Sequence, residues 1–457
     1  MLSNRLQLLL ESTRRLVRRG NVQNLRKLAL KARAPDLAHL FRFLGEHERR
    51  QVLKVLGDKE KQAELISELD VNLAVELISQ LNPEESAEIL AYVPNDDVAD
   101  ILGELDEEDA ETILSRMKAK EQEQVSQLMH YQEDTAGGIM SPDFFALQES
   151  CTTQEAIERL RNATDVEMAF YIYVQDEHGH LVGVCSLRQL VVTKPDVPLS
   201  EIMVTSVIRV NTETDQEEVA RLVHMYGFLA LPVVDEHNVL VGIVTVDDVI
   251  DVIKEEATED ILKMAGAGED LTQDLSPIRA IRGRLPWLFA AWLGEIASVW
   301  VIGSNQAALR KVAILASFIP VIMAMGGNVG NQAATLVVRG LALGRINVGQ
   351  LGRVLGRQSL IGVVLGIFFG GLLALVALLF FGKEMGGSLV DIPFVVGAAI
   401  CIQMTLAAFI GTMLPMIFEK LKVDPAVATA PFLSTSMDFI GILVYFNMAV
   451  YLLNLRT

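Results

Sequence analysis

The apolar C-terminal part of this 457-residue chain contains one cysteine and no histidine. The three cysteines, Cys151, Cys185 and Cys401, are far apart, odd in number and without metal-ligand spacing, so they predict no disulfide framework. We therefore expect the soluble part of the chain to face a reducing cytoplasm. All seven histidines precede residue 238, which argues against an imidazole site for zinc or copper in the apolar C-terminal part.

Other absences narrow the class of protein. The chain has no Gly-x-x-x-x-Gly-Lys-Ser/Thr phosphate loop, which argues against a pump driven by ATP hydrolysis. It has no nucleophile with a neighbouring base and no cofactor loop, so we do not expect an enzyme. The 58 acidic against 39 basic side chains argue against nucleic-acid binding, because phosphate contacts need a basic surface.

Charge and hydropathy divide the chain near Ser276-Pro277. Residues 1–278 contain 52 acidic and 26 basic side chains, whereas residues 279–457 contain 6 and 13. The second part holds five apolar stretches of the roughly 20 residues that cross a bilayer. They lie near residues 286–307, 312–338, 355–382, 391–418 and 426–453. This pattern predicts a multi-pass membrane protein, in contact with lipid, that carries a large acidic soluble part.

Basic residues in the short loops set the orientation of the spans. With the N-terminus inside, the inner face carries nine of them: Arg279, Arg282, Arg284, Arg339, Arg345, Arg353, Arg357, Lys420 and Lys422. The outer face carries four: Arg310, Lys311, Lys383 and Arg456. We therefore expect a plasma (inner) membrane protein with cytoplasmic N-terminal domains and, because the number of spans is odd, the C-terminus outside.

Two acidic side chains lie well inside these spans, away from the span ends. Asp438 lies about midway through the fifth span with no Lys or Arg in the same helix, and Glu295 lies in the first span. A carboxylate near the bilayer centre costs about 2.5 to 3.5 kcal/mol on insertion scales and is usually functional. A transported cation would supply the missing charge. A protonated carboxyl group that is hydrogen-bonded to a neighbouring helix is the structural alternative at both positions.

The second span contains a cluster of flexible and amide residues: Gly326, Gly327, Asn328, Gly330, Asn331 and Gln332. At membrane depth they favour backbone released from helical hydrogen bonds, which is tolerated where it lines a watery cavity. Freed carbonyl and amide oxygens are ligands for a hard cation such as Mg²⁺, Ca²⁺ or Mn²⁺. Close helix packing through the glycines is the alternative, and it leaves the amides unexplained.

A period of 12 residues runs through residues 63–117. Ile66, Ile78, Leu90, Leu102 and Leu114 are evenly spaced, with turn residues between the blocks. This spacing predicts short helices of about two turns that stack into a superhelical array. Acidic residues, among them Asp96 and Asp100, gather on the polar side of the array, where a plainly solvated face is the alternative to a binding role.

Residues 137–255 contain a second duplication, of mixed strand and helix. The segment 176–184, Asp-Glu-His-Gly-His-Leu-Val-Gly-Val, recurs at 235–243 as Asp-Glu-His-Asn-Val-Leu-Val-Gly-Ile. In both copies β-branched runs flank a polar turn, which is typical of a β-hairpin. This duplication resembles a tandem CBS module.

The end of each copy bears on nucleotide binding. In the second copy Thr245 and Asp248 are similar to the Ser/Thr-x-x-Asp pattern that contacts ribose in nucleotide-binding CBS pairs, so ATP is a candidate ligand. The first copy has Ser186 but Gln189 in place of the acid. This difference argues against a symmetric pair of nucleotide sites.

An acidic helix is expected after the last strand of the second copy. Asp247, Asp251, Glu255 and Glu259 are spaced at four and share one helical face, and Asp248, Glu256 and Asp260 crowd an adjacent face. Each such pair of like charges costs roughly a few tenths of a kcal/mol. Divalent cations bound between these acids would relieve the repulsion; a plain solvated helix is the alternative.

The order of these parts is similar to that of the MgtE family of magnesium channels and transporters. Three motifs carry the resemblance, which covers essentially the whole chain: Pro320-x5-Gly-Gly-Asn-Val-Gly-Asn-Gln332, Asp424-Pro-Ala, and the segment from Pro431 to Asp438. The resemblance implies a multidomain protein with an α-helical superhelical repeat domain, α/β tandem CBS domains and a polytopic α-helical membrane domain with five transmembrane helices. The implied domains are the repeat at 1–135, CBS copies at 136–200 and 201–255, a connecting (plug) helix at 252–278 and the membrane domain at 279–457.

The resemblance also implies a function. It predicts a homodimeric, Mg²⁺-selective channel or transporter for magnesium uptake, with a pore built largely from the second and fifth spans and an ion site at Asp438. Cytosolic Mg²⁺ bound between the acidic domains would shut this pore through the connecting helix. The implied sensor acids are Asp96, Asp100, Asp248, Asp251, Glu256, Glu259 and Asp260. The alternative is a carrier for divalent cations, coupled to Na⁺ or H⁺, whose CBS pair senses adenine nucleotides.

Overall fold

The computed structural model describes residues 4–163, 170–265, 277–342, 344–381, 391–428 and 430–453. It divides into two compact units, Met1–Ile253 and Lys254–Thr457. The first unit holds the acidic soluble part, and the second holds the end of the acidic helix together with the apolar part. The boundaries predicted above between the individual domains stay predictions.

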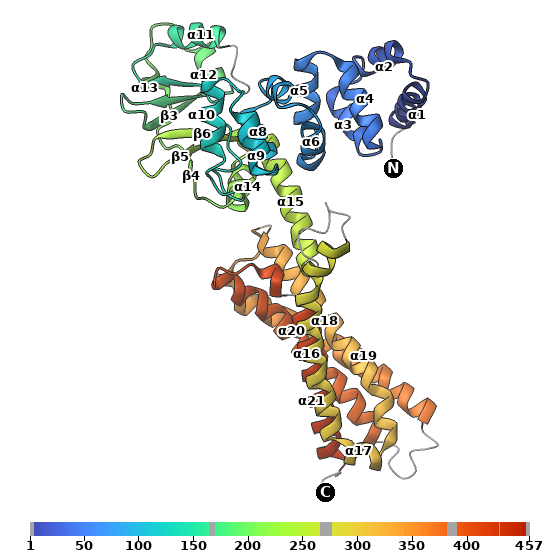
Figure 1. The fold of residues 1–457 in the computed structure, drawn as a ribbon. Helices are drawn as coiled ribbons and strands as arrows, with labels where there is room; N and C mark the ends of the chain where they lie inside the picture. Colours follow the sequence, from blue (N-terminus) through green and yellow to red (C-terminus); the bar gives the residue numbers. More distant parts are fainter. Residues whose placement is uncertain are drawn as a thin grey trace. The chain divides into compact units, whose positions relative to one another are not determined.

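The first unit begins with a helical array. Its helices are α1 (Asn4–Arg18), α2 (Val22–Ala29), α3 (Ala34–Phe41), α4 (Glu46–Leu56), α5 (Lys59–Ser67), α6 (Val71–Ile78), α7 (Pro83–Leu90), α8 (Asn95–Gly103), α9 (Glu107–Leu114) and α10 (Ala119–Leu128) (Figure 1). From α5 to α9 each helix begins 12 residues after the one before it. The predicted period of 12 is therefore confirmed as one short helix per repeat.

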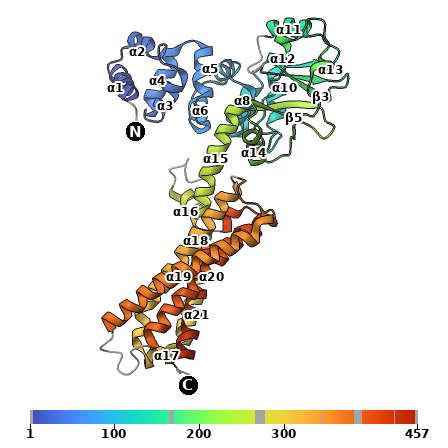
Figure 2. The same ribbon diagram turned by 180° about the vertical axis from the view of Figure 1, so that it is seen from behind.

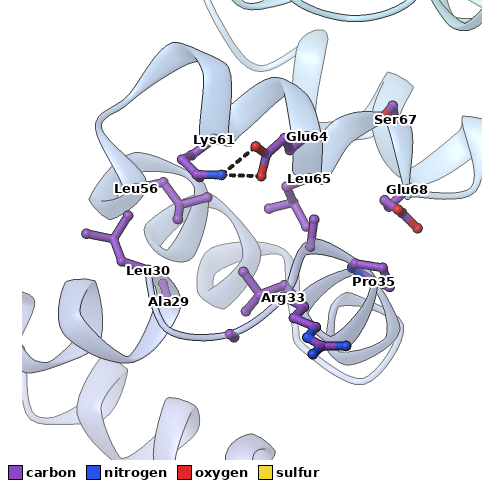
Figure 3. A pocket seen from close by; sticks show the side chains of 13 residues that line it. Ala29, Leu30, Arg33, Pro35, Leu56, Lys61, Glu64, Leu65, Ser67 and Glu68 are labelled. Carbon is purple, nitrogen blue, oxygen red and sulfur yellow. Dashed lines mark hydrogen bonds and ion pairs between the residues drawn. The ribbon is translucent and has the colours of Figure 1, made fainter. Parts of the chain in front are cut away.

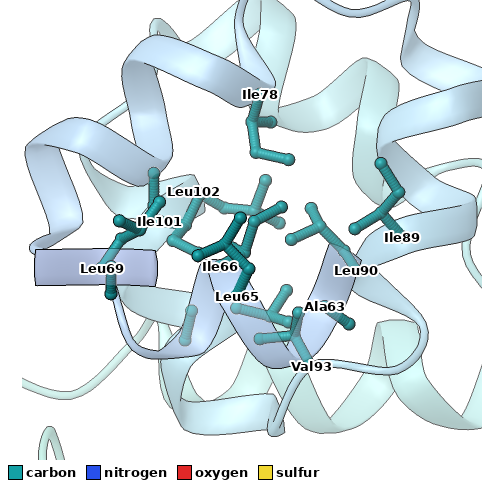
Figure 4. Packing of buried hydrophobic residues seen from close by; sticks show 14 of the residues in the cluster. Ala63, Leu65, Ile66, Leu69, Ile78, Ile89, Leu90, Val93, Ile101 and Leu102 are labelled. Atoms are coloured by element: carbon teal, nitrogen blue, oxygen red, sulfur yellow. The ribbon is translucent and has the colours of Figure 1, made fainter. Parts of the chain in front are cut away.

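Packing explains why such short helices are stable. Helices of eight or nine residues are marginal in isolation, because nucleation costs more than a few hydrogen bonds return. Here the repeated positions Ile66, Ile78 and Leu90 are almost completely buried in one shared core (Figure 4). At the start of α7, the Asn82 side chain accepts the N–H of Glu85 at 2.8 Å, and Pro83 occupies the first helical position. The turn at Asn82 and Pro83 therefore fixes the start of α7.

Two matching α/β copies complete the first unit. The first copy holds β1 (Ala146–Gln148), α11 (Thr153–Asn162), β2 (Tyr171–Gln175), β3 (Leu181–Ser186) and α12 (Leu187–Val192). The second holds α13 (Leu199–Ile202), β4 (Val210–Asn211), α14 (Gln216–Tyr226), β5 (Ala230–Val234) and β6 (Leu240–Thr245). Each copy forms a three-stranded sheet in which the middle strand pairs parallel with the first strand and antiparallel with the third.

A methionine of each copy packs against a glycine in the sheet of the other copy. Met140 packs over Gly242 in the second sheet, and Met203 packs over Gly183 in the first, so closely that a Cβ at either glycine would lie within 2.6 Å of a methionine sulfur. Met140 and Met203 both follow an isoleucine, Ile139 and Ile202, and occupy matching positions in the two copies, so each methionine packs on the sheet of the other copy. This explains both why the duplication includes them and why glycine occupies the facing strand positions.

The acidic helix is α15 (Val246–Met264). It begins directly after β6, which confirms the acidic helix expected after the last strand of the second copy. Thr245 hydrogen-bonds to Asp248 and so caps the helix at this point. The predicted connecting helix extended to residue 278, and its residues 266–276 lie outside the described residues.

The second unit is a bundle of long helices. Its elements after α15 are α16 (Pro277–Ser304), α17 (Gln306–Lys311), η2 (Ala313–Phe318), α18 (Ile319–Ala342), η3 (Val348–Gln350), α19 (Leu351–Phe381), α20 (Asp391–Lys420), η4 (Pro425–Ala428) and α21 (Ala430–Leu452). Within this unit α18 packs against both α20 and α21, and α16 packs against α21 (Figures 1 and 2).

Five stretches in the described residues are long and apolar enough to span a membrane: Ile281–Ser304, Ala313–Ala342, Leu351–Phe380, Ile392–Lys420 and Phe432–Leu452. They confirm the five predicted spans. The largest differences are at two starts. The first stretch begins five residues earlier than predicted because α16 continues through Pro286. The fifth begins six residues later because η4 occupies its predicted start.

Candidate ion pathway and regulatory acidic sites

The cluster of glycines and amides in the second span lies on α18, and this helix is unbroken from Ile319 to Ala342. The expectation of backbone carbonyls freed from helical hydrogen bonds is therefore wrong. The glycines serve close packing instead: a Cβ at Gly411 of α20 would lie 2.3 Å from the carbonyl oxygen of Gly330. Gly326, Gly327 and Gly330 are all buried.

A glutamine explains two glycines on different helices. Gln403 of α20 is 1% exposed and donates from Nε2 to the carbonyl oxygen of Met437 at 2.7 Å. A Cβ at Gly326 would lie 2.0 Å from that nitrogen, and a Cβ at Gly441 would lie 2.2 Å from it. The Gln403 amide therefore fills the space that glycine leaves on α18 and α21, and it holds the backbone of α21 next to Asp438.

The three amide side chains of the cluster have different surroundings. Asn331 is half-buried and donates from Nδ2 to the Ser434 hydroxyl at 2.8 Å, which ties α18 to α21 one turn before Asp438. Asn328 and Gln332 are exposed on α18. Two exposed amides on a membrane-length helix are poorly suited to lipid, because hydrocarbon offers them no hydrogen-bond partner.

Asp438 of α21 lies next to the other acidic side chain of the spans. Both Asp438 and Glu295 of α16 are half-buried, and their carboxyl groups are close enough to interact directly. The helices approach closely here, since a Cβ at Gly294 would lie 2.9 Å from Cβ of Thr435, one turn before Asp438. Two carboxyl groups together at membrane depth require either a shared proton or a bound cation.

In the first unit, the acidic cluster centres on Asp248. Its side chain accepts a hydrogen bond from Thr245, and burial, followed by the nearby charges of Asp96 and Asp247, raises its pKa to about 7. Asp96, at the start of α8, is half-buried, and Asp100 is exposed one turn later. The structure thus brings Asp96 of the helical array and Asp248 of the second copy together, whereas Asp247 and Asp251 are exposed on α15.

A second acidic cluster lies at the end of α15 in the second unit. Burial, followed by the charges of Asp424 and Glu256, raises the pKa of Asp260 to about 6. Lys263 forms an ion pair with Asp424 at 2.8 Å and another with Glu259. The four predicted sensor acids in this part of α15 differ in exposure. Glu256, Glu259 and Asp260 are half-buried, whereas Glu255 is exposed.

The candidate nucleotide residues also act as helix caps. Thr245 donates from its hydroxyl to Asp248, and in the first copy Ser186 donates from its hydroxyl to Gln189 at 3.0 Å. The same cap therefore forms with either an acid or an amide. Asp248 is shared between the predicted metal site and the predicted nucleotide site, so the two ligands would compete for it.

A pocket of about 460 Å³ lies between the α2–α3 connection and α5 (Figure 3). Lys61 and Glu64, which pair with each other, line one side, and Arg33 lies on the other. None of the predicted pore, metal or nucleotide residues lines this pocket.

Three residues that the sequence did not single out complete the candidate sites: Gln403, Ser434 and Lys263. Gln403 had a usable signal, since it is an amide in the middle of an apolar span. Ser434 belongs to the Pro431–Asp438 motif without standing out in it. Lys263 had no signal, because a lysine on an acidic helix is common.

Comparisons with known proteins agree with this arrangement. Family models match residues 32–134 as the MgtE intracellular N domain, residues 136–193 and 199–255 as CBS domains, and residues 319–448 as the MgtE divalent cation transporter domain. The helical array, the tandem CBS domains and the five membrane-length helices therefore define a multi-pass divalent cation transporter.

Curated relatives show the family. The chain is 40% identical to "Magnesium transporter MgtE" of Thermus thermophilus over 334 residues, 72% of each chain. It is 38% identical to the protein of the same name from Bacillus subtilis over 326 residues, 71% of each chain. The chain belongs to the MgtE family of magnesium transporters, which is a family of transporters and not of enzymes.

Two solved structures resemble the soluble part. The crystal structure of the cytosolic domain of the Mg²⁺ channel MgtE in complex with ATP has a TM-score of 0.51 and 40% identity, and the match covers 53% of this chain and 99% of that one. The crystal structure of the soluble part of a magnesium transporter has a TM-score of 0.50 and 32% identity, with 55% and 99% covered. These matches support the predicted helical array followed by tandem CBS domains.

Proposed function

We propose that this protein carries Mg²⁺ into the cell across the plasma (inner) membrane and is shut by Mg²⁺ on the cytoplasmic side. The relatives named as magnesium transporters support the substrate. The single observation that carries the proposal is the carboxyl pair of Asp438 and Glu295 at membrane depth. Asp438 is the principal ion site, because its helix contains no Lys or Arg that could neutralise it.

A homodimer follows from the exposed face of α18. Asn328 and Gln332 are polar, exposed and at membrane depth, so they require a partner other than lipid. A second copy that packs on this face would place both amides along a pore between the two chains. Their oxygens would then contact the water shell of Mg²⁺, which sheds its waters reluctantly. In this arrangement the buried glycines shape the pore wall without binding the ion.

Closure by Mg²⁺ follows from the acidic clusters. Without Mg²⁺ the carboxylates around Asp248 and Asp96, and those around Asp260 and Asp424, repel one another within their clusters. Bound Mg²⁺ removes this repulsion and holds α15 and its neighbours in one arrangement. The remaining members of the regulatory set, Asp100, Asp247, Asp251, Glu255, Glu256 and Glu259, contribute charge to one cluster or the other. Because Mg²⁺ is held partly through its waters, we expect weak regulatory affinity suited to cytosolic concentrations.

The topology follows from the basic residues near the span ends. Nine of them lie in the loops on the side of the membrane from which the acidic domains enter it. These domains are therefore cytoplasmic, and the C-terminus is outside. ATP is a candidate ligand at Thr245 and Asp248, supported by the ATP complex of the related cytosolic domain. Since Asp248 belongs to both sites, ATP would alter the Mg²⁺ concentration at which transport stops.

The test is Mg²⁺ flux into liposomes that contain the purified protein, measured with and without Mg²⁺ on the cytoplasmic side. We expect uptake that stops when cytoplasmic Mg²⁺ is raised. Uptake that continues unchanged would contradict regulation by Mg²⁺, and absence of Mg²⁺ uptake under all conditions would contradict the transport function itself.

The carboxyl pair also supports one alternative, a carrier coupled to H⁺. A carboxyl group that shares a proton with its neighbour can release it when a cation binds, which is the chemistry of coupled exchange. The same liposomes with an imposed pH gradient and no Mg²⁺ gradient distinguish the two mechanisms. A coupled carrier accumulates Mg²⁺ against its gradient, whereas a channel does not.

A further inference from the structure

A cluster of metal-ligating side chains lies in the first CBS copy, far along the chain from the acidic residues of α15. It is formed by Asp176, His178 and His180, in the turn that joins β2 to β3. One ligand atom from each side chain lies within 4.8 Å of the other two. Asp176 and His180 are half-buried, and His178 is exposed. The cluster uses two of the chain's seven histidines, and the transport function requires neither of them.

The turn holds these side chains in defined positions. Asp176 Oδ1 accepts the backbone N–H of His178 at 2.8 Å and that of His180 at 2.9 Å. Asp176 Oδ2 lies 2.8 Å from Nδ1 of His180, and the two imidazole rings are stacked with centroids 5.9 Å apart.

The matching turn of the second copy separates the structural role from a binding role. There Asp235 Oδ1 accepts the backbone N–H of His237 at 2.9 Å and that of Val239 at 2.8 Å. The two turns therefore share the aspartate and its backbone hydrogen bonds. Valine occupies the position of His180 in the second turn, so folding of the turn accounts for the aspartate and not for the second imidazole.

We propose that Asp176, His178 and His180 form a binding site for a divalent transition-metal cation of the Zn²⁺ or Ni²⁺ type. Imidazole nitrogens are good ligands for these metals, whereas Mg²⁺ prefers sites made of oxygen atoms. The imidazoles of His178 and His180 supply the ligand atoms. The carboxylate of Asp176, which contacts Nδ1 of His180, orients that ring and leaves its Nε2 able to bind the metal, an arrangement that recurs around metal-bound histidines. Water completes the coordination shell, because the site is open to solvent at His178.

The site lies next to the junction of the two CBS copies, so metal binding is expected to stabilise that junction. The turn contacts the matching turn of the second copy, where the N–H of Leu181 donates to the carbonyl oxygen of Asn238 at 3.0 Å and the N–H of Leu240 donates to that of Gly179 at 3.3 Å. The two hairpins are thus joined next to the metal ligands. A bound metal fixes the first turn and with it this junction, so it stabilises the CBS pair without occupying the Mg²⁺-binding carboxylates. The proposal does not depend on the proposed transport function.

The test is calorimetry with Zn²⁺ and separately with Ni²⁺ on the untagged full-length protein in detergent, stripped of metal and kept in excess Mg²⁺. His180→Val reproduces the residue of the second copy, so the turn is expected to fold. His178→Gln is a second variant that leaves the aspartate and its backbone hydrogen bonds in place. His237→Ala is the matched control, since it removes the imidazole of the other turn.

We expect one transition-metal site per chain that survives excess Mg²⁺, with affinity at least roughly tenfold lower in His180→Val and in His178→Gln and unchanged in His237→Ala. X-ray absorption at the zinc edge should show nitrogen ligands that decrease in number in both variants. Zinc should also raise the thermal unfolding temperature of the unmodified protein more than that of either variant. Equal affinity in all four proteins, displacement of the metal by Mg²⁺, or no binding by the unmodified protein would each overturn the assignment.

Discussion

Lys263, in the last turn of α15, forms an ion pair at 2.8 Å with Asp424, which lies directly before η4 and α21. Asp424 Oδ1 also accepts the N–H of Ala426 at 2.8 Å, so the same side chain caps the turn that leads into α21. Through this one contact the acidic helix is linked to the start of the helix that carries Asp438. The ammonium group of Lys263 lies among the carboxylates that we propose bind regulatory Mg²⁺.

Replacing Lys263 should change the response of transport to low Mg²⁺. In Lys263→Gln the carboxylates of Glu259 and Asp424 lose their fixed counter-charge, so their repulsion is stronger when Mg²⁺ is scarce. A partly exposed pair of this kind is worth up to about 1 kcal/mol, or roughly a fivefold change in the ratio of open to closed protein. We expect higher flux at low cytoplasmic Mg²⁺ and normal closure at high Mg²⁺ in the liposome assay. Lys420→Gln, which removes an exposed charge from the end of α20, is the control, and equal flux in the two variants would contradict the linkage.

Neutralising the acidic helix should abolish closure. The triple variant Asp248→Asn, Asp251→Asn, Glu259→Gln removes carboxylates from both acidic clusters while keeping side-chain size and polarity. We expect flux that no longer stops at high cytoplasmic Mg²⁺, because no charge remains for the ion to bridge at these positions. Normal closure in this variant would remove the acidic helix from the mechanism.

Closure should also depend on pH. The pKa values of Asp248 and Asp260 are raised to about 7 and about 6. Both groups bind Mg²⁺ only when ionised, so lowering the cytoplasmic pH from about 8 to about 6 should increase the Mg²⁺ concentration needed for closure. Asp248→Asn should lose the part of this dependence near pH 7. A closure curve that is independent of pH in the unmodified protein would contradict the ionisation of these acids as the basis of sensing.

The same raised pKa values predict the effect of pH on stability. A carboxyl group whose pKa is higher in the folded state binds more protons when folded, so stability without Mg²⁺ falls as pH rises from about 4 to about 7. Bound Mg²⁺ stabilises the ionised form and should flatten this decrease. Thermal unfolding of the full-length protein at pH 5 and pH 7, with and without Mg²⁺, measures both effects. Equal loss of stability with and without Mg²⁺ would contradict binding at these groups.

The packing of Gln403 gives a prediction for the membrane helices. In Gly326→Ala the new Cβ would lie 2.0 Å from Nε2 of Gln403, which must move and lose its hydrogen bond to the Met437 carbonyl. Overpacking of this kind costs about 1 to 3 kcal/mol, so we expect a lower unfolding temperature together with reduced Mg²⁺ flux. Gly371→Ala on α19 is the control, because a Cβ at Gly371 would meet no atom within 4 Å. Equal stability and flux in both variants would contradict the positioning role of Gln403.

Some features of the fold could be predicted because they depend on local repetition. Each 12-residue block repeats the same buried and turn positions, so the sequence alone predicts the helices α5 to α9 with their spacing. The β-hairpins of the CBS pair could be predicted for the same reason. The five spans could be predicted from hydropathy. The largest differences between predicted and observed bounds are at the start of the first span, where α16 continues through Pro286, and at the start of the fifth, where η4 precedes α21.

The state of α18 could not be predicted from its own residues. Glycine permits both a broken helix and close packing, and the choice between them depends on the partner that faces it. That partner is Gln403, on a helix distant in sequence, which fills the space beside Gly326 and Gly441. The ion pair between Lys263 and Asp424 could not be predicted for the same reason, because the sequence singles out Asp424 in a motif without showing which residue faces it. Asp438 could be selected because an unpaired acid in an apolar span is costly wherever the other helices lie.

Mg²⁺ flux by Asp438→Asn tests the central claim most directly. The variant removes one charge and keeps the shape of the side chain, so it separates ion binding from folding; Glu419→Gln, at the exposed end of α20, is the control. In liposomes with equal amounts of folded protein, verified by size-exclusion chromatography, we expect flux to fall to background in Asp438→Asn and to remain normal in Glu419→Gln. Near-normal Mg²⁺ flux in Asp438→Asn would contradict the assignment of Asp438 as the ion site of the pore.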